Sequence, residues 1–261
     1  HANHPTMQTR SILISALVVA VLLIGGGGAA YFLFLRGDEV APLALPSSAP
    51  VASTATDPTA AGSSGVGTSL PPASGATLDA ASVPGTWAIG ANSIVGYRVR
   101  ERLASLSADS DAVGRTQSIT GSVTIAGSGT SLTVSKADFS VDMTSLASDK
   151  QMRDNRLRSQ GIETDTYKTS TFNLTQPISL PANATSGTTF DVTLHGDLTL
   201  HGVTKTVDIP AKAQLSANLI QVQGSLTFPF SDYNIVAPNI GNFVTVQDNG
   251  TLEFLVNLTK A

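Results

Sequence analysis

Apolar and polar residues alternate along much of the C-terminal two thirds of the chain. The clearest stretch runs from Phe190 to Leu200, where apolar side chains stand at 190, 192, 194, 198 and 200 with polar residues between them. A period of two residues indicates a strand with one buried face and one wet face. The same reasoning predicts further strands over 94–103, 118–125, 132–143, 171–175, 207–215, 220–230 and 252–258.

One short helix is expected among these strands. Ser148, with Gln151 three residues later, matches a capping box, and Gly161 suits the far end of such a helix. About eight half-buried antiparallel strands and one helix predict an all-β fold that closes into a barrel. An eight-stranded barrel has room for one small ligand if its inward side chains leave space.

The inward positions of the predicted barrel are almost entirely apolar. Such an interior cannot orient a polar substrate, but it suits an alkyl or prenyl chain, because each buried CH₂ group is worth about 0.8 kcal/mol. The same side chains could instead meet and fill a solid core, and the periodicity alone leaves both readings open. The residues predicted to line the lumen are Leu194, Leu198, Ile209, Ala211, Val222, Leu226, Phe228, Phe230 and Phe254.

Several motifs of this region occur in an order that resembles a known family. They are the segments 149–167, 196–207, 231–235 and 250–258. In this order they are similar to the YceI family of polyisoprenoid-binding proteins, and the resemblance covers roughly Thr86 to Ala261. The openings 96–101 (GYRVRE) and 114–116 (GRT) resemble the actinobacterial branch of that family. The resemblance implies a lipocalin-like antiparallel barrel that holds a long isoprenoid or another lipid tail.

Charged residues crowd the expected helix. Asp149 and Arg153, and then Asp154 and Arg158, stand four residues apart and can pair across one turn. Arg153 and Arg156 are also suited to a phosphate or quinone head group at the barrel mouth. The alternative is that the arginines only fasten the helix over the barrel. The aromatic residues expected to shape the entrance are Tyr167, Phe172 and Tyr233.

Catalytic and metal-binding sites find little support. His195, Asp197 and His201 lie out of phase with the apolar set, so they are expected to face solvent. The two histidines are six residues apart, which separates them by roughly 20 Å along a strand, too far to share one ion. No serine stands in a nucleophile-elbow motif, and no acidic pair faces inward. We therefore expect neither an enzyme nor a metal or other cofactor.

The N-terminal region predicts a membrane anchor. Residues 11–35 carry no charge, and a helix of this length at about 1.5 Å per residue exceeds the bilayer core of about 30 Å. Arg10 and Arg36 flank this run, and the short tail 1–10 favours a cytoplasmic N-terminus. A cleavable signal peptide ending near residues 28–30 is the alternative, but Tyr31 to Leu35 continue the apolar run beyond it.

The segment 36–85 is rich in Ala, Ser, Thr, Gly and Pro and poor in large apolar residues, which predicts a disordered linker. The barrel domain is expected over 86–261. The chain has no cysteine, so disulfides and thiolate metal sites are excluded. Its formal net charge is −4, which argues against a nucleic-acid partner.

Together these features predict a single-pass membrane protein whose domain lies on the extracytoplasmic or periplasmic side. It would bind or carry a hydrophobic lipid, most simply an isoprenoid quinone or a polyprenyl lipid, without covalent chemistry. The alternative is a filled barrel that serves as a surface interaction or stress-protective module and has no lipid ligand.

Overall fold

The computed structural model describes residues 40–46, 79–103, 109–216, 218–238 and 244–261. The predicted tail 1–10, the predicted membrane helix 11–35 and most of the predicted linker lie outside these residues. Within the described ranges, no helix combines the length and apolar character needed to cross a bilayer.

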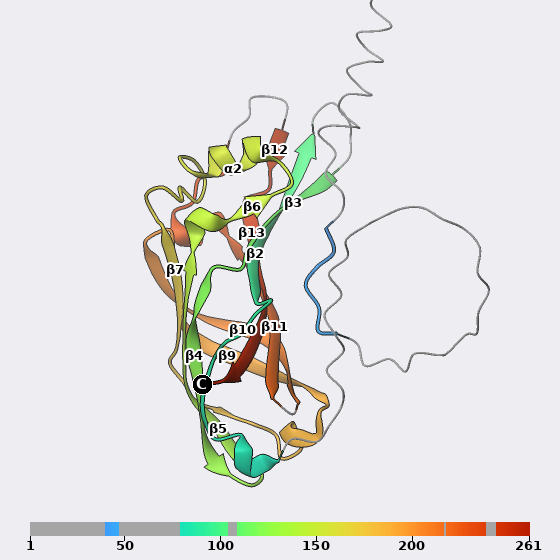
Figure 1. Ribbon diagram of the computed structural model, residues 1–261. Helices are drawn as coiled ribbons and strands as arrows, with labels where there is room; N and C mark the ends of the chain where they lie inside the picture. The colour runs from blue at the N-terminus through green and yellow to red at the C-terminus, as the bar shows by residue number, and fades with distance from the viewer. Residues whose placement is uncertain (1–39, 47–78, 104–108, 217, 239–243) are drawn as a thin grey trace, which may run out of the picture. The chain divides into compact units, whose positions relative to one another are not determined.

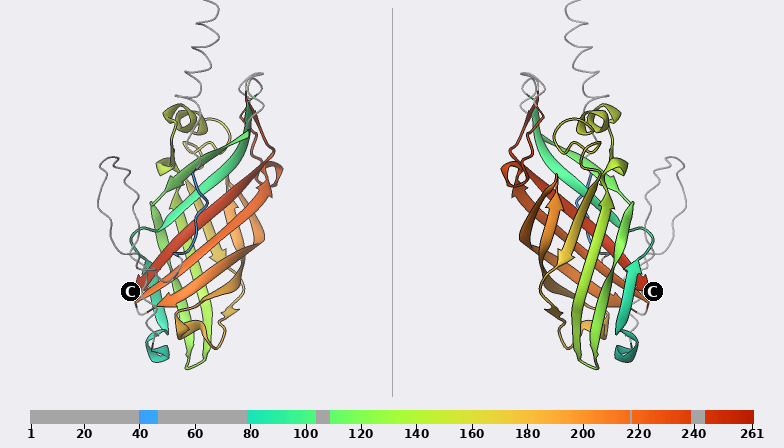
Figure 2. Two further views of the ribbon diagram at one scale, coloured as in Figure 1. Left: turned by 90° about the vertical axis from the view of Figure 1, so that its right-hand side faces the viewer. Right: turned by 90° about the vertical axis from the view of Figure 1, so that its left-hand side faces the viewer.

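An antiparallel ring of eight strands forms the domain (Figures 1 and 2). Each strand pairs with two neighbours, and the ring closes where β1 meets β13, with Trp87 opposite Lys260. The predicted eight-stranded antiparallel barrel is thereby confirmed. The strands of the ring are, in spatial order, β1 (Gly85–Ile89), β4 (Ile119–Ser128), β5 (Ser131–Asp142), β7 (Thr169–Leu174), β9 (Thr189–Leu200), β10 (Val203–Ser216), β11 (Leu219–Pro229) and β13 (Asn249–Lys260).

Four further strands extend the ring at one end. They are β2 (Ile94–Leu103), β3 (Asp109–Thr116), β6 (Ala147–Ser148) and β12 (Val244–Val246). β2 continues β1 along the same side of β13, and β3 runs on into β4, so that β1–β2 and β3–β4 together form one long hairpin. β6 continues β5 and pairs with β3. The strands of the ring therefore follow one another in sequence order, each antiparallel to the one before it. β8 (Ile178–Ser179) pairs with Thr133 and Val134 of β5.

The α-helix of the domain, α2 (Gln151–Leu157), lies between β6 and β7. The predicted capping box is wrong, because Ser148 still belongs to β6 and Lys150 precedes the helix without a side-chain cap. Ser148 instead donates to Asp154 Oδ1 at 2.6 Å. The 3₁₀ turns are η1 (Ala80–Ser82), η2 (Met143–Ser145), η3 (Ala184–Ser186) and η4 (Phe230–Tyr233).

The two ends of the barrel differ. Because neighbouring strands are antiparallel, α2, the β9–β10 turn and η4 share one end, which we call the mouth (Figure 1). At the opposite end, which we call the base, Val83, Leu215 and Leu258 are at most 1 % exposed. Trp87, 2 % exposed, donates from its indole nitrogen to the Val83 carbonyl at 2.8 Å. These side chains seal the base.

The ordered domain begins before Thr86, the boundary expected from composition. Val83 belongs to the core, and Asp79 caps η1 by accepting from the Ala81 amide at 3.0 Å. Lys260 donates to the carbonyl oxygens of Ser82 and Pro84, at 2.7 and 2.5 Å. Composition misses this segment because a single buried valine among small and polar residues produces no periodic signal.

We expect a chain that starts at Asp79 to be measurably more stable than one that starts at Thr86. Burial of Val83 contributes about 2 kcal/mol, and about 2–4 °C of melting temperature corresponds to each kcal/mol in a domain of this size. Thermal unfolding should therefore place the two midpoints roughly 5 °C apart or more. Equal midpoints would mean that the η1 segment adds nothing to the barrel.

Candidate functional site

The nine predicted lumen residues come together in one apolar cluster inside the barrel. Five of them are buried in its centre, and the other four are partly buried and packed against it. The buried members are Leu198, Ile209, Ala211, Phe230 and Phe254, and the partly buried members are Leu194, Val222, Leu226 and Phe228. Phe230 lies in η4 rather than on a strand, because β11 ends at Pro229.

Inward side chains keep some accessible surface at both ends of the barrel. Leu226 and Leu252 in the mouth half, and Phe190 and Ile89 near the base, are partly buried. Tyr233 at the mouth and Leu258 at the base are almost fully buried. The interior is apolar along its whole length.

Aromatic rings lie against the barrel wall because glycines make room for them on neighbouring strands. A Cβ atom at Gly196 would lie 2.5 Å from the Phe172 ring, and one at Gly224 would lie 2.6 Å from the Phe254 ring. A flat ring on the wall occupies less of the lumen than one that projects inward. Further pairs of this kind among the described residues are Tyr97 with Gly114, Phe139 with Gly121 and Phe230 with Gly250.

The pairing between β10 and β11 stops before these strands reach the mouth. The β10–β11 ladder ends at the pair Ala211–Gly224, and from there β10 pairs only with β9 and β11 only with β13. Pro210, which has no N–H group to donate, stands where the ladder ends. Nearer the mouth, Lys205 on β10 bridges to Asp232 in η4 at 2.6 Å.

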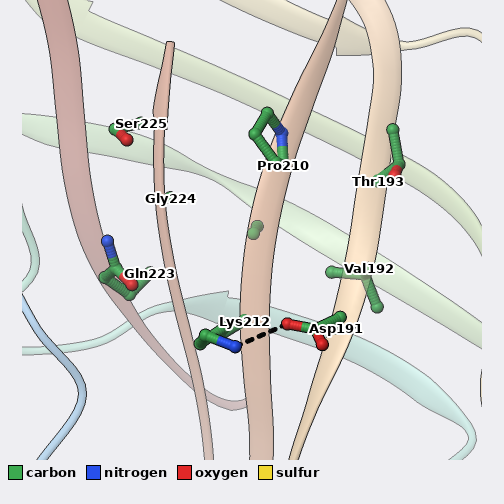
Figure 3. Close-up of a pocket in the computed structure, with 9 residues that line it drawn as sticks. Asp191, Val192, Thr193, Pro210, Lys212, Gln223, Gly224 and Ser225 are labelled. Atoms are coloured by element: carbon green, nitrogen blue, oxygen red, sulfur yellow. Dashed lines mark hydrogen bonds and ion pairs between the residues drawn. The ribbon is translucent and has the colours of Figure 1, made fainter.

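An open groove of about 440 Å³ lies over this point (Figure 3). Its polar lining includes Lys212, which donates to Asp191 Oδ1 at 2.6 Å, together with Gln223 and Ser225. Lys212, Gln223 and Ser225 are out of phase with the inward Ala211 of β10 and Val222 of β11, so their side chains belong to the outer face. The lining also includes Val192, Ala211 and Gly224, which have the inward phase.

Three segments are joined at the mouth by His201. His201 and Gly202 form the two-residue β9–β10 turn with φ values of 51° and 72°, and the imidazole is only 7 % exposed. Its Nδ1 lies 2.9 Å from the Tyr233 carbonyl oxygen, and its Nε2 lies 2.8 Å from Glu163 Oε2. The expectation that His201 faces solvent was wrong, because positions in the turn leave the strand's alternation.

Aromatic contacts also hold these three segments together at the mouth. The rings of Tyr167 and His201 are 4.1 Å apart, and a Cβ atom at Gly202 would lie 2.7 Å from the Tyr167 ring. Tyr233 is 1 % exposed and meets Phe228 edge to face at 5.0 Å. The predicted entrance residues Tyr167 and Tyr233 therefore lie at the mouth, while Phe172 lies deeper, among the core side chains.

Arg153 fastens α2 to the barrel. Its guanidinium lies 2.5 Å from Asp149 and 3.6 Å from Glu101 on β2. Burial favours the neutral form of this group, but the two carboxylates outweigh burial and raise the pKa of Arg153. The predicted Asp149–Arg153 pair is confirmed.

The second predicted ion pair of the helix is wrong. Asp154 accepts hydrogen bonds from Ser148, and Arg158 lies 3.5 Å from Asp165. Arg156 is half-buried on α2. Its role at a head group stays a prediction.

The outward histidine of β9 takes part in surface pairing. His195 Nδ1 lies 2.6 Å from Asp208 Oδ1, and Asp197 accepts from the Thr206 hydroxyl at 2.6 Å. Among the described residues, no three His, Asp or Glu side chains gather as metal ligands would.

Solved structures resemble this chain at low sequence identity. A polyisoprenoid-binding domain from Saccharophagus degradans, implicated in plant cell wall breakdown, is 20 % identical, with 68 % of this chain and 99 % of that chain covered and a TM-score of 0.52. BcnA of Burkholderia cenocepacia is 18 % identical over 62 % and 95 % of the two chains, with a TM-score of 0.44. The Campylobacter jejuni YceI protein is 19 % identical over 57 % and 84 %, with a TM-score of 0.45.

No curated protein matches the sequence. The model of the YceI-like domain family, by contrast, matches residues 89–258, which include every strand of the ring except β1 and the last two residues of β13. This match spans more than half of the chain and coincides with the barrel. The chain therefore belongs to the YceI-like domain family.

Proposed function

We propose that the barrel binds a hydrophobic isoprenoid or another lipid in its lumen and serves as a carrier or binding protein, without covalent chemistry. The observation that carries this proposal is the apolar interior of the closed barrel. All nine predicted lumen residues pack in one cluster, and several of them, such as Leu226 and Phe228, are only partly buried although they face this interior.

The likeness to solved structures agrees with this proposal. The Saccharophagus degradans domain, described as polyisoprenoid binding, shares the fold. Fold alone does not assign a ligand, so the proposal for this chain rests on the apolar residues of its own interior. Rings that pack over glycines take up less of the interior, and a ligand there would gain about 0.8 kcal/mol for each CH₂ group that it buries.

We also propose that the uncharged run 11–35 tethers the barrel to the cell membrane, with the domain on the extracytoplasmic side. The support is the length and apolar character of this run in the sequence. A tethered barrel would stay close to the bilayer that stores isoprenoid lipids.

Purified protein from a lipid-replete host should retain its ligand. Native mass spectrometry is expected to show one lipid mass above the polypeptide, and organic extraction should release the same molecule in stoichiometric amount. A clean apo mass under these conditions would favour the alternative, a filled interaction module.

A charge inside the lumen should expel the lipid, whereas the same charge on the outside should not. Phe228 points inward, and its neighbour Thr227 is exposed on the same strand. Phe228→Asp buries a carboxylate without a basic partner, and co-purified lipid is expected to fall at least about tenfold. Thr227→Asp is the matched control and should retain lipid, with an effect on stability within about 0.5 kcal/mol. Equal lipid content in the two variants would refute the inward assignment.

Fractionation of cells that express the full chain tests the tether. We expect the protein in the membrane pellet, resistant to salt and carbonate and released only by detergent, because an apolar helix is held by its burial in hydrocarbon. A soluble mature form that begins near Tyr31 would show instead that the run is a cleaved signal peptide.

A further inference from the structure

Two side chains of β13 are buried although their phase directs them away from the lumen. Glu253 is 3 % exposed and Leu255 is 5 % exposed, and both are out of phase with the inward Phe254. The outward positions 204, 206, 208 and 212 of β10 are exposed by contrast. Part of the outer face at β13 is therefore covered, and a carboxylate is buried there.

Glu253 is held by two arginines of neighbouring strands. Arg115 Nη2 lies 2.7 Å from Glu253 Oε1, and Arg98 Nη2 lies 3.4 Å from Glu253 Oε2. Gly96 of β2 stands between Arg115 and Glu253 in the ladder, and a Cβ atom there would lie 2.7 Å from Arg115 Cγ. Glycine at this position lets the Arg115 side chain cross β2. A buried carboxylate needs such partners, because an unpaired charge in this place would be costly.

Arg115 also binds a segment that precedes the barrel in the sequence. The same Nη2 atom donates to the Ala41 carbonyl oxygen at 2.6 Å. Residues 41–46 (APLALP), which we call the strap, belong to the compact unit Ala41–Ala261 that contains the barrel. Arg115 therefore joins an outward carboxylate of the barrel to the backbone of a segment that composition predicts to be linker.

Exposure along the strap indicates that one of its faces is turned toward a surface. Leu43 and Leu45 are half-buried, whereas Ala44 between them is exposed. Pro42 and Pro46 fix their own φ angles and restrict the residue before each of them to extended backbone. A segment that is extended before it docks loses little conformational freedom on docking.

We propose that the outer face of β2, β3 and β13 around Arg115 and Glu253 is a docking site whose partner is the strap of the same chain. Leu43 and Leu45 supply the apolar contact, and the Ala41 carbonyl oxygen supplies the hydrogen bond. The docked strap limits how far the barrel can stand from the uncharged run 11–35. This consequence rests on the proposed membrane tether, whereas the docking itself does not.

Covalent geometry gives the size of this effect. Leu35 and Ala41 are six residues apart, so the chain between them spans at most about 20 Å, at roughly 3.4 Å per residue. Without a docked strap the connection would run to Asp79, 44 residues from Leu35, and could extend to about 150 Å. Docking would therefore shorten the longest possible tether about sevenfold and keep the barrel beside the bilayer.

Distances between two spin labels test the docking in the full chain, held in detergent. The chain has no cysteine, so Ala44→Cys and Lys136→Cys place one label on the strap and one on the exposed outer face of β5. A docked strap should give one narrow distance distribution, because both positions then belong to one rigid unit. Leu43→Ser combined with Leu45→Ser should broaden it, and the matched control Ala41→Ser, at an exposed position, should leave it narrow.

Arg115→Gln tests the barrel side of the contact and should broaden the distribution as well. It also leaves the buried Glu253 with one arginine fewer. The strap variants change no residue of the barrel, so they decide the question even if Arg115→Gln does not fold.

A parent distribution as broad as that of the double leucine variant would overturn the docking site. A narrow distribution that disappears when labelled protein is diluted with unlabelled protein would show that the strap docks on a second copy. That outcome would overturn the assignment to the same chain.

Energy transfer from a dye at position 136 to acceptor lipids tests the shortened tether, with the full chain reconstituted in vesicles. Transfer should be stronger for the parent than for the double leucine variant. Equal transfer in the two proteins would overturn the shortened tether. A parent that does not associate with vesicles at all would refute the proposed membrane tether and leave the docking site intact.

Discussion

Closure of the strand ladder is the constraint on which the rest of the structure depends. The pairing of β1 with β13 through Trp87 and Lys260 turns an up-and-down sheet into a ring. An open sheet would leave two edges of unpaired backbone groups and one apolar face in water. The ring instead encloses that face and gives every strand two neighbours at the base. The packing of Trp87, the shielded interior and the separate mouth all follow from this closure.

Different kinds of interaction hold the mouth and the base together. Apolar contacts dominate at the base, where Trp87, Leu215 and Leu258 are at most 2 % exposed. Polar contacts hold the mouth: His201 joins Glu163 to the Tyr233 carbonyl, and Arg153 joins α2 to Glu101. Ion pairs and hydrogen bonds between short segments open at lower cost than a packed core. A ligand would therefore exchange through the mouth, where β10 and β11 are also no longer paired with each other.

Alternation along the chain was enough to predict the long strands and the inward phase of residues such as Leu198 and Phe254. It missed the ring strand β1 (Gly85–Ile89), whose place in the expected count of eight was taken by β2. It also missed β3, because Asp109 and Asp111 take part in ion pairs with Arg100 and so leave no simple polar and apolar order. Alternation along a strand does not predict where side chains point in the turn that follows it, which is why His201 was wrongly expected to face solvent.

The site was harder to predict from sequence than the fold. Arg153, Tyr233 and Tyr97 all belong to motif segments, but the sequence does not show that Tyr97 packs over Gly114 of another strand. The signal was present as a pattern of inward glycines opposite aromatic residues. That pattern becomes visible only once the register of the strands is known.

A crystal structure of the domain isolated with its native ligand would test the central claim most directly. The account predicts continuous, elongated density along the barrel axis, beginning under α2 and ending above Trp87 near the base. Inward side chains that meet across the axis, with no density between them, would contradict it.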